Sequence, residues 1–180
     1  GMKAGDNEHV WYQPTTIKRL TQQLADQYSK LDPAHATYYH RRARAYLQSL
    51  QPLDQIIAQA KRGVGTKRAV AVSEPVFDYA LTNLGYQVVD SHFAKAVEDG
   101  SDPSPQDIAA LQAAIKNHQI AFFVENAQAD DRVVNNLVQL ARQHGVPVLK
   151  VTESKPNGLS YEQWMTKQYQ QLIRIQEKED

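Results

Sequence analysis

Apolar residues in the first third of the chain recur at the spacing of a helix with one buried side. In residues 14–31 they lie three or four positions apart: Ile17, Leu20, Leu24 and Tyr28. This spacing predicts an amphipathic helix, with Pro14 in its first turn. A second helical stretch runs from Pro33 to Gly63. Pro52 lies inside it and lacks a backbone donor, which predicts a kink or a break at that point.

After Gly65 the pattern changes to short apolar runs that alternate with amphipathic segments. This alternation is typical of βαβ units and predicts a parallel sheet. Strands are expected over residues 69–72, 87–89, 120–124 and 148–151. Helices are expected over residues 75–84, 105–118, 132–144 and 160–175. The predicted fold class is therefore α/β, with a four-stranded, mostly parallel sheet flanked by helices and preceded by a long helical segment.

Carboxylates accompany the ends of three expected strands, at Glu74, Glu125 and Glu153. Right-handed crossovers bring the carboxyl ends of parallel strands to one edge of a sheet, where open α/β sheets bind ligands. We therefore expect these side chains to gather there. Glu74 and Glu153, together with His9 far upstream, supply the nitrogen and oxygen donors that a divalent transition metal accepts. Glu125, Asp130 and Asp131 are interpreted as surface or neighbouring charges, not as ligands.

Composition narrows the range of functions. Lysine plus arginine and aspartate plus glutamate each number 20, and the basic residues form no stripe interleaved with aromatics. Nucleic acid is therefore not an expected partner. Cysteine is absent, which excludes disulfides, thiolate metal sites and thiol nucleophiles. The sequence contains no serine elbow, His-Glu-x-x-His pair or phosphate loop.

Several short segments, taken in order, resemble motifs of the metal-specific solute-binding proteins of ABC transporters, the group that takes up zinc or manganese. Asn7-Glu8-His9-Val10-Trp11 is similar to the Asp-Pro-His-x-Trp segment of that family, although Asn7 and Glu8 replace its aspartate and proline. The other segments are residues 31–39 with 46–47, 73–79, 102–107, 122–125 with 130–132, and 151–153. Their order and spacing together make the resemblance fairly specific.

The resemblance implies that His9, Glu74 and Glu153 are metal ligands. A glutamate at the position of Glu74 is typical of manganese-type members, so it favours manganese modestly over zinc. The implied function is to capture a divalent metal ion outside the cell and deliver it to a membrane permease. The ion is then the transported ligand, no catalytic cofactor is needed, and the protein is not an enzyme.

The resemblance also implies a division of the chain. Residues 1–32 would be the remnant of an N-terminal lobe, residues 33–64 an interlobe helical linker, and residues 65–180 the C-terminal α/β lobe. The rest of the N-terminal lobe, with the family's first histidine ligand and a signal peptide or lipid anchor, would precede residue 1. We therefore expect an extracytoplasmic protein, periplasmic or lipid-anchored. With one of the family's ligands outside this chain, we expect the fragment to bind metal weakly if at all.

Other interpretations of the same residues remain open. His9 could be a structural histidine, Glu74 could cap a helix, and Glu153 could be a solvated loop acid. A metal-dependent hydrolase could use Glu74 or Glu153 as a general base. Alternatively, the front helices could dock a partner, or the fragment could dimerise through an uncovered face formed by Ile17, Leu20 and Leu24.

Overall fold

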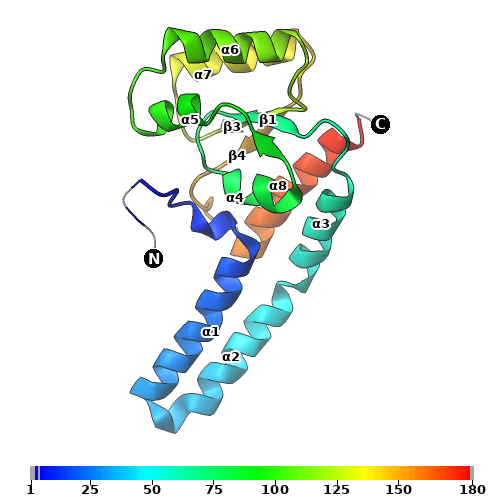
Figure 1. The fold of residues 1–180 in the computed structure, drawn as a ribbon. Coiled ribbons are helices and arrows are strands. Elements are labelled where there is room, and N and C mark those ends of the chain that lie inside the picture. The colour runs from blue at the N-terminus through cyan, green and yellow to red at the C-terminus, as the bar shows by residue number, and fades with distance from the viewer. Residues whose placement is uncertain (1–2, 4, 179–180) are drawn as a thin grey trace.

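The protein consists of an α/β lobe from which a helical hairpin projects (Figure 1). The computed structural model describes residue 3 and residues 5–178. The sheet of the lobe has the order β2-β1-β3-β4, and every pairing in it is parallel. Its strands are β1 (Ala69–Val72), β2 (Gln87–Val88), β3 (Phe123–Asn126) and β4 (Val148–Val151). The predicted fold class is confirmed.

Helices cover both faces of the sheet, and each face has its own apolar core. The helices of the lobe are α4 (Asp78–Leu84), α5 (Ser91–Glu98), α6 (Pro105–Lys116), α7 (Arg132–Gln143) and α8 (Tyr161–Gln176). Val70 and Val72 of β1 pack in one core with residues of α4 and α8. Ala71, between them, packs in the other core with residues of α6 and α7. Successive strand residues point to opposite faces, so one short strand contributes to both cores.

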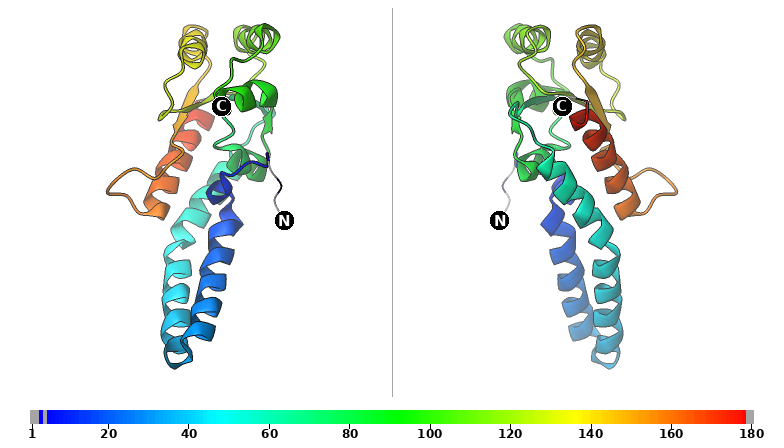
Figure 2. Two further views of the ribbon diagram at one scale, coloured as in Figure 1. Left: turned by 90° about the vertical axis from the view of Figure 1, so that its left-hand side faces the viewer. Right: turned by 90° about the vertical axis from the view of Figure 1, so that its right-hand side faces the viewer.

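The front of the chain forms three helices. They are α1 (Pro14–Leu31), α2 (Ala36–Ser49) and α3 (Gln51–Arg62), and short 3-10 helices at Val10–Tyr12 and Pro33–His35 precede α1 and α2. The break predicted near Pro52 is confirmed, because α2 ends at Ser49 and Pro52 lies in the first turn of α3. α1 and α2 lie against each other and extend away from the lobe, whereas α3 packs on α8 (Figures 1 and 2). None of the described helices is long and apolar enough to cross a membrane.

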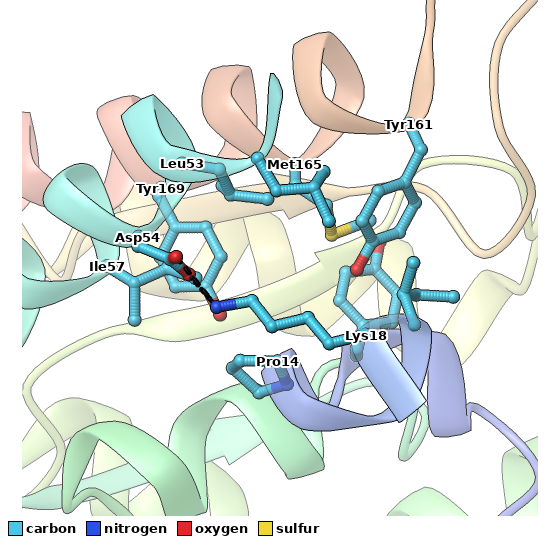
Figure 3. A pocket seen from close by; sticks show the side chains of 11 residues that line it. Pro14, Lys18, Leu53, Asp54, Ile57, Tyr161, Met165 and Tyr169 are labelled. Atoms are coloured by element: carbon cyan, nitrogen blue, oxygen red, sulfur yellow. Dashed lines mark hydrogen bonds and ion pairs between the residues drawn. The ribbon is translucent and has the colours of Figure 1, made fainter. Parts of the chain in front are cut away.

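The hairpin is fixed to the lobe where α1, α3 and α8 meet. Lys18 Nζ lies 2.6 and 2.7 Å from the two carboxylate oxygens of Asp54 (Figure 3). The cavity beside this ion pair, lined also by Tyr161, Met165 and Tyr169, has a volume of about 10 Å³. That volume is roughly enough for one water molecule. The junction is therefore a packed contact and not a ligand pocket.

Beyond the junction, one side of the hairpin exposes apolar side chains. The exposed stripe consists of Leu20, Leu24, Tyr28 and Tyr38, each roughly half exposed. The expectation that Leu20 and Leu24 would be uncovered is confirmed. It is wrong for Ile17, which is half-buried because the first turns of α1 pack against α3 and α8.

Some elements of the lobe differ from those predicted from the sequence. Helix α5 was not predicted, because its eight residues are too few for a clear period. Strand β3 was expected to begin at residue 120 but begins at Phe123 and runs on to Asn126, since its last two residues pair with Lys150 and Val151 of β4. The helix after β1 begins three residues later than expected.

A half-buried carboxylate, Asp90, links β1 to the start of α5 and makes the stability of the lobe depend on pH. Both carboxylate oxygens of Asp90 lie 3.1 Å from the backbone N–H of Val72, which donates to them. Burial raises the pKa of Asp90 from 3.8 to about 8. Between about pH 3.8 and pH 8, the folded protein therefore holds a proton that the unfolded chain releases. The free energy of unfolding falls as the pH rises through this range.

We expect Asp90→Asn to flatten this pH dependence. The amide oxygen still accepts the bond from Val72 and carries no charge, so the variant should exceed the parent in stability above pH 8, by on the order of a few kcal/mol. Urea unfolding at a series of pH values measures the difference. Asp102→Asn, at an exposed position, is the control and should follow the parent. Parallel curves for Asp90→Asn and the parent would contradict the prediction.

Candidate metal centre

The segment just before α1 lies against the lobe and carries His9 with it. The hydroxyl of Tyr79 in α4 donates to the carbonyl of Asn7 at 2.8 Å. The hydroxyl of Tyr161 in α8 donates to the carbonyl of Trp11 at 2.7 Å. These two tyrosines, which lie 82 residues apart in the chain, thus hold the segment from two different helices. His9 lies between the two anchored residues, Asn7 and Trp11.

His9 is buried, with an exposed fraction of 2%. Its Nδ1 lies 2.8 Å from Asn7 Oδ1, and its Nε2 lies 3.9 Å from Glu153 Oε1. The ring of Trp11 meets the imidazole edge to face, with 5.3 Å between the ring centres. The imidazole is therefore held by its neighbours in one orientation, and one of its nitrogens faces a carboxylate just past β4.

Glu74 lies two residues past β1 and is half-buried. Asn126, the last residue of β3, donates from Nδ2 to Glu74 Oε2. Burial is the main cause that raises the pKa of Glu74, and the charges of Glu153 and Glu98 raise it further. The hydrogen bond from Asn126 and the charge of His9 act in the opposite direction. Glu74 thus lies within electrostatic reach of both other candidate ligands.

The three candidate ligands gather at the carboxyl edge of the sheet, but they do not converge on one point. Glu153 is half exposed, and its carboxylate stays 3.9 Å from the imidazole. Across residue 3 and residues 5–178, no group of three or more histidine, aspartate or glutamate side chains has the arrangement to hold a metal ion. The assignment of His9, Glu74 and Glu153 as ligands therefore remains a prediction.

Glu125 does not join this group, which corrects the expectation that it would. It lies inside β3, and its Oε2 is 3.6 Å from Lys150 Nζ and 3.9 Å from Arg142 Nη2. Because β3 runs further than expected, Asn126 and not Glu125 reaches Glu74. Asp131 caps α7 by accepting a hydrogen bond from the backbone N–H of Val134, in keeping with its exclusion from the ligand set.

Two acidic residues near the candidate ligands were not found from the sequence. Glu98 Oε1 lies 3.7 Å from His9 Nδ1 and is buried without a hydrogen-bond partner, while its other oxygen is 2.8 Å from Lys95 Nζ. The pKa of Asp78 is raised to about 6, first by burial and then by the charge of Glu98. Glu98 ends the unpredicted helix α5, so no motif indicated it. This accumulation of carboxylates around one imidazole favours a cation.

A family model described as component A, periplasmic, of a zinc-uptake complex matches residues 2–175. The chain belongs to this family. The predicted resemblance is therefore confirmed at the level of the zinc-uptake family.

Members of the zinc-uptake family and related proteins match most of this chain. The high-affinity zinc uptake system protein ZnuA of Bacillus subtilis is 22% identical over 129 residues, which are 72% of this chain and 39% of that protein. The manganese-binding lipoprotein MntA of the same organism is 25% identical over 139 residues, 76% of this chain and 44% of that protein. The aligned parts thus span less than half the length of these two curated relatives.

Solved structures share the fold. The solute-binding protein FpvC of Pseudomonas aeruginosa, in complex with Ni²⁺, superposes with a TM-score of 0.75 at 22% identity, over 97% of this chain and 64% of that chain. The periplasmic zinc-binding protein TroA of Treponema pallidum gives a TM-score of 0.73 at 18% identity, over 93% and 63%. The architecture of an α/β lobe with a projecting hairpin is therefore shared with these solved structures.

Asn126 is expected to hold Glu74 in its charged form. Asn126→Ala removes a hydrogen bond that lowers the pKa of Glu74, so this pKa should rise further. The backbone N–H of Gln128, which donates to Asn126 Oδ1, also loses its partner, and the free energy of unfolding should fall by about 1–3 kcal/mol. Carbon-13 NMR titration of the Glu74 carboxyl and urea unfolding measure the two effects.

The control for this variant is Asn136→Ala, on an exposed turn of α7. It should leave the titration of Glu74 in place. A Glu74 pKa that is equal in Asn126→Ala and in the parent would show that the amide does not act on this carboxylate.

Proposed function

We propose that this chain binds a divalent transition metal ion as cargo, as the substrate-binding component of an ABC transporter. The observation that carries the proposal is the position of His9. It comes from a segment that precedes the lobe, yet it is buried beside Glu153 and within electrostatic reach of Glu74, at the edge of a parallel sheet where ligands bind. Membership of the zinc-uptake family supports the same function.

The donor set fits zinc or manganese. Neutral imidazole nitrogen with carboxylate oxygen suits either ion, and the chain contains no cysteine that would favour softer metals. Relatives are named for zinc and for manganese. Affinity at a given site generally favours zinc, so preference for manganese would have to come from the geometry of the two glutamates and from metal supply.

Binding of the ion would relieve the charge repulsion at the site. Glu74 is held by Asn126, and His9 by Asn7 and Trp11, so these two groups form the fixed part of the centre. Glu153 is exposed and can approach once a cation offsets the repulsion between the carboxylates. Closure of ligands from several elements around the ion would then signal that the receptor is loaded.

The proposed partner is a membrane permease, and the loaded protein would dock on its extracytoplasmic side. The family description places its members in the periplasm, and the relative MntA is named as a lipoprotein. We propose the same extracytoplasmic location here, and a role in binding and delivery without catalysis. The sequence contains no serine elbow, His-Glu-x-x-His pair or phosphate loop that would favour a hydrolase.

Titration of the 180-residue chain with Zn²⁺ and with Mn²⁺ tests the metal site. Isothermal calorimetry should show one saturable site, and Glu74→Gln with Glu153→Gln should weaken it at least about tenfold, because two anionic donors become neutral. The control is Asp102→Asn with Glu177→Gln, which removes the same charge at exposed positions. Equal affinity in the two double variants, or no saturable site in the parent, would contradict the proposed function.

We further propose that the exposed stripe of the hairpin pairs with a second copy of this chain at high concentration. Leu24, Tyr28 and Tyr38 line a groove between α1 and α2, and Leu20, which is also exposed, lies four residues before Leu24. The net charge of the chain is zero, so long-range repulsion does not oppose association.

Sedimentation velocity over a range of concentrations tests this association. Leu24→Glu should shift the chain towards the monomer, since a charge in the stripe would be buried by pairing. Gln23→Glu places the same charge on the same helix outside the stripe and should have little effect. A monomer at all concentrations in the parent would rule out the dimer.

A further inference from the structure

The side-chain amide of Asn7 contacts His9, and its orientation is determined by partners other than the imidazole. Its Nδ2 lies 2.6 Å from the carbonyl oxygen of Pro75, which can only accept a hydrogen bond. Its Oδ1 lies 2.9 Å from the backbone N–H of His9, which can only donate. The opposite orientation would set donor against donor and acceptor against acceptor. The oxygen of the amide therefore faces the ring.

This orientation decides which ring nitrogen carries the proton. Asn7 Oδ1 lies 2.8 Å from His9 Nδ1, and an amide oxygen has no proton to donate. The hydrogen bond forms only if Nδ1 is protonated. Neutral imidazole has a single ring proton, so Nε2 is left with its lone pair. Nε2 is the nitrogen that faces Glu153.

We propose that Asn7 is a positioning residue, which holds His9 in the Nδ1-protonated tautomer and so presents Nε2 to a metal ion. The part of this proposal that concerns the metal ion rests on the proposed function. The amide is anchored to Pro75, next to the candidate ligand Glu74, so one side chain ties the imidazole to the loop after β1. Partners of this kind orient metal-binding histidines and raise the basicity of the ligand nitrogen.

The neutral amide also limits the strength of the site. A carboxylate in the same place would accept a stronger, charge-assisted hydrogen bond from Nδ1 and make Nε2 a better donor. Glu98 is the other acceptor near Nδ1, but at 3.7 Å it is beyond hydrogen-bond distance. Asn7 is therefore the group that sets the tautomer, and its lack of charge moderates the affinity for the ion.

The tautomer can be observed without metal. Long-range proton–nitrogen NMR of the 15N-labelled chain, at a pH where the ring is neutral, distinguishes protonated from unprotonated ring nitrogens, and His9→Ala assigns the signals. The parent should show Nδ1 protonated and Nε2 bare. Asn7→Ala should give a mixture of tautomers, and Asn117→Ala, at an exposed position, should match the parent. Asn7→Asp gives up the bond to Pro75, but its carboxylate can only accept from Nδ1, so it should keep the parental tautomer. A parent His9 protonated at Nε2 overturns the inference, whatever the chain binds.

Calorimetry with Zn²⁺ tests the consequence for binding. Asn7→Ala should weaken binding about 10- to 100-fold. Asn7→Asp should bind more tightly than Asn7→Ala, because its carboxylate still accepts from Nδ1 although it gives up the bond to Pro75. Equal affinity in Asn7→Ala and the parent overturns the role of Asn7 in binding. If the parent shows the expected tautomer but binds no Zn²⁺, the proposed function fails while the assignment of the tautomer stands. Failure of Asn7→Ala to fold leaves the parent spectrum and Asn7→Asp to decide.

Discussion

The arrangement of the molecule depends on how Tyr12 is buried. Its ring makes edge contacts with Phe77 and Trp164, at centre distances of 5.0 and 5.5 Å. Its hydroxyl donates to the carbonyl of Thr152 at 2.5 Å and lies 2.9 Å from Gln168 Oε1. Burial raises the pKa of this phenol far above its usual range, so the hydroxyl stays a neutral donor. One side chain thereby links the start of the chain to the residue just after β4 and to α8.

Two features follow from this anchor. His9 lies three residues before Tyr12, so the imidazole is carried to the carboxyl edge of the sheet. α1 begins two residues after Tyr12, so the direction in which the hairpin leaves the lobe is set at the same place. The ion pair between Lys18 and Asp54 adds little to the stability of the junction, since both side chains are partly exposed. The burial of Tyr12 and the packing of α3 on α8, more than the ion pair, fix the hairpin on the lobe.

The edge of the sheet concentrates negative charge that Lys95, beside Glu98, offsets only in part. Glu98 keeps a buried oxygen without a partner, and the pKa values of Glu74 and Asp78 are raised by burial together with neighbouring carboxylates. Such an arrangement costs stability unless a cation is present. The side chains that hold the site in place are amides, Asn7 and Asn126, which bind their neighbours without adding charge. The lobe thus gathers carboxylates at this edge at some cost to its own stability.

The sequence determined the elements that have a clear local period and the identity of the candidate ligands. α1 and the strands β1 and β4 have the predicted bounds, because an apolar stripe or a short apolar run is a property of neighbouring residues. The end of β3 could not be predicted, since it is set by pairing with β4, and α5 is too short to show a period. His9, Glu74 and Glu153 were indicated as candidate ligands by motifs.

Only the tertiary structure decided what surrounds those ligands. Asn7 reaches Pro75 across 68 positions of the chain, and Asn126 reaches Glu74 across 52. No local pattern encodes such contacts, because they arise when the carboxyl ends of separate strands meet at one edge. The sequence named an imidazole and two carboxylates. The fold decided which nitrogen of that imidazole is unprotonated and which carboxylate accepts a hydrogen bond from Asn126. Both depend on hydrogen bonds between distant segments.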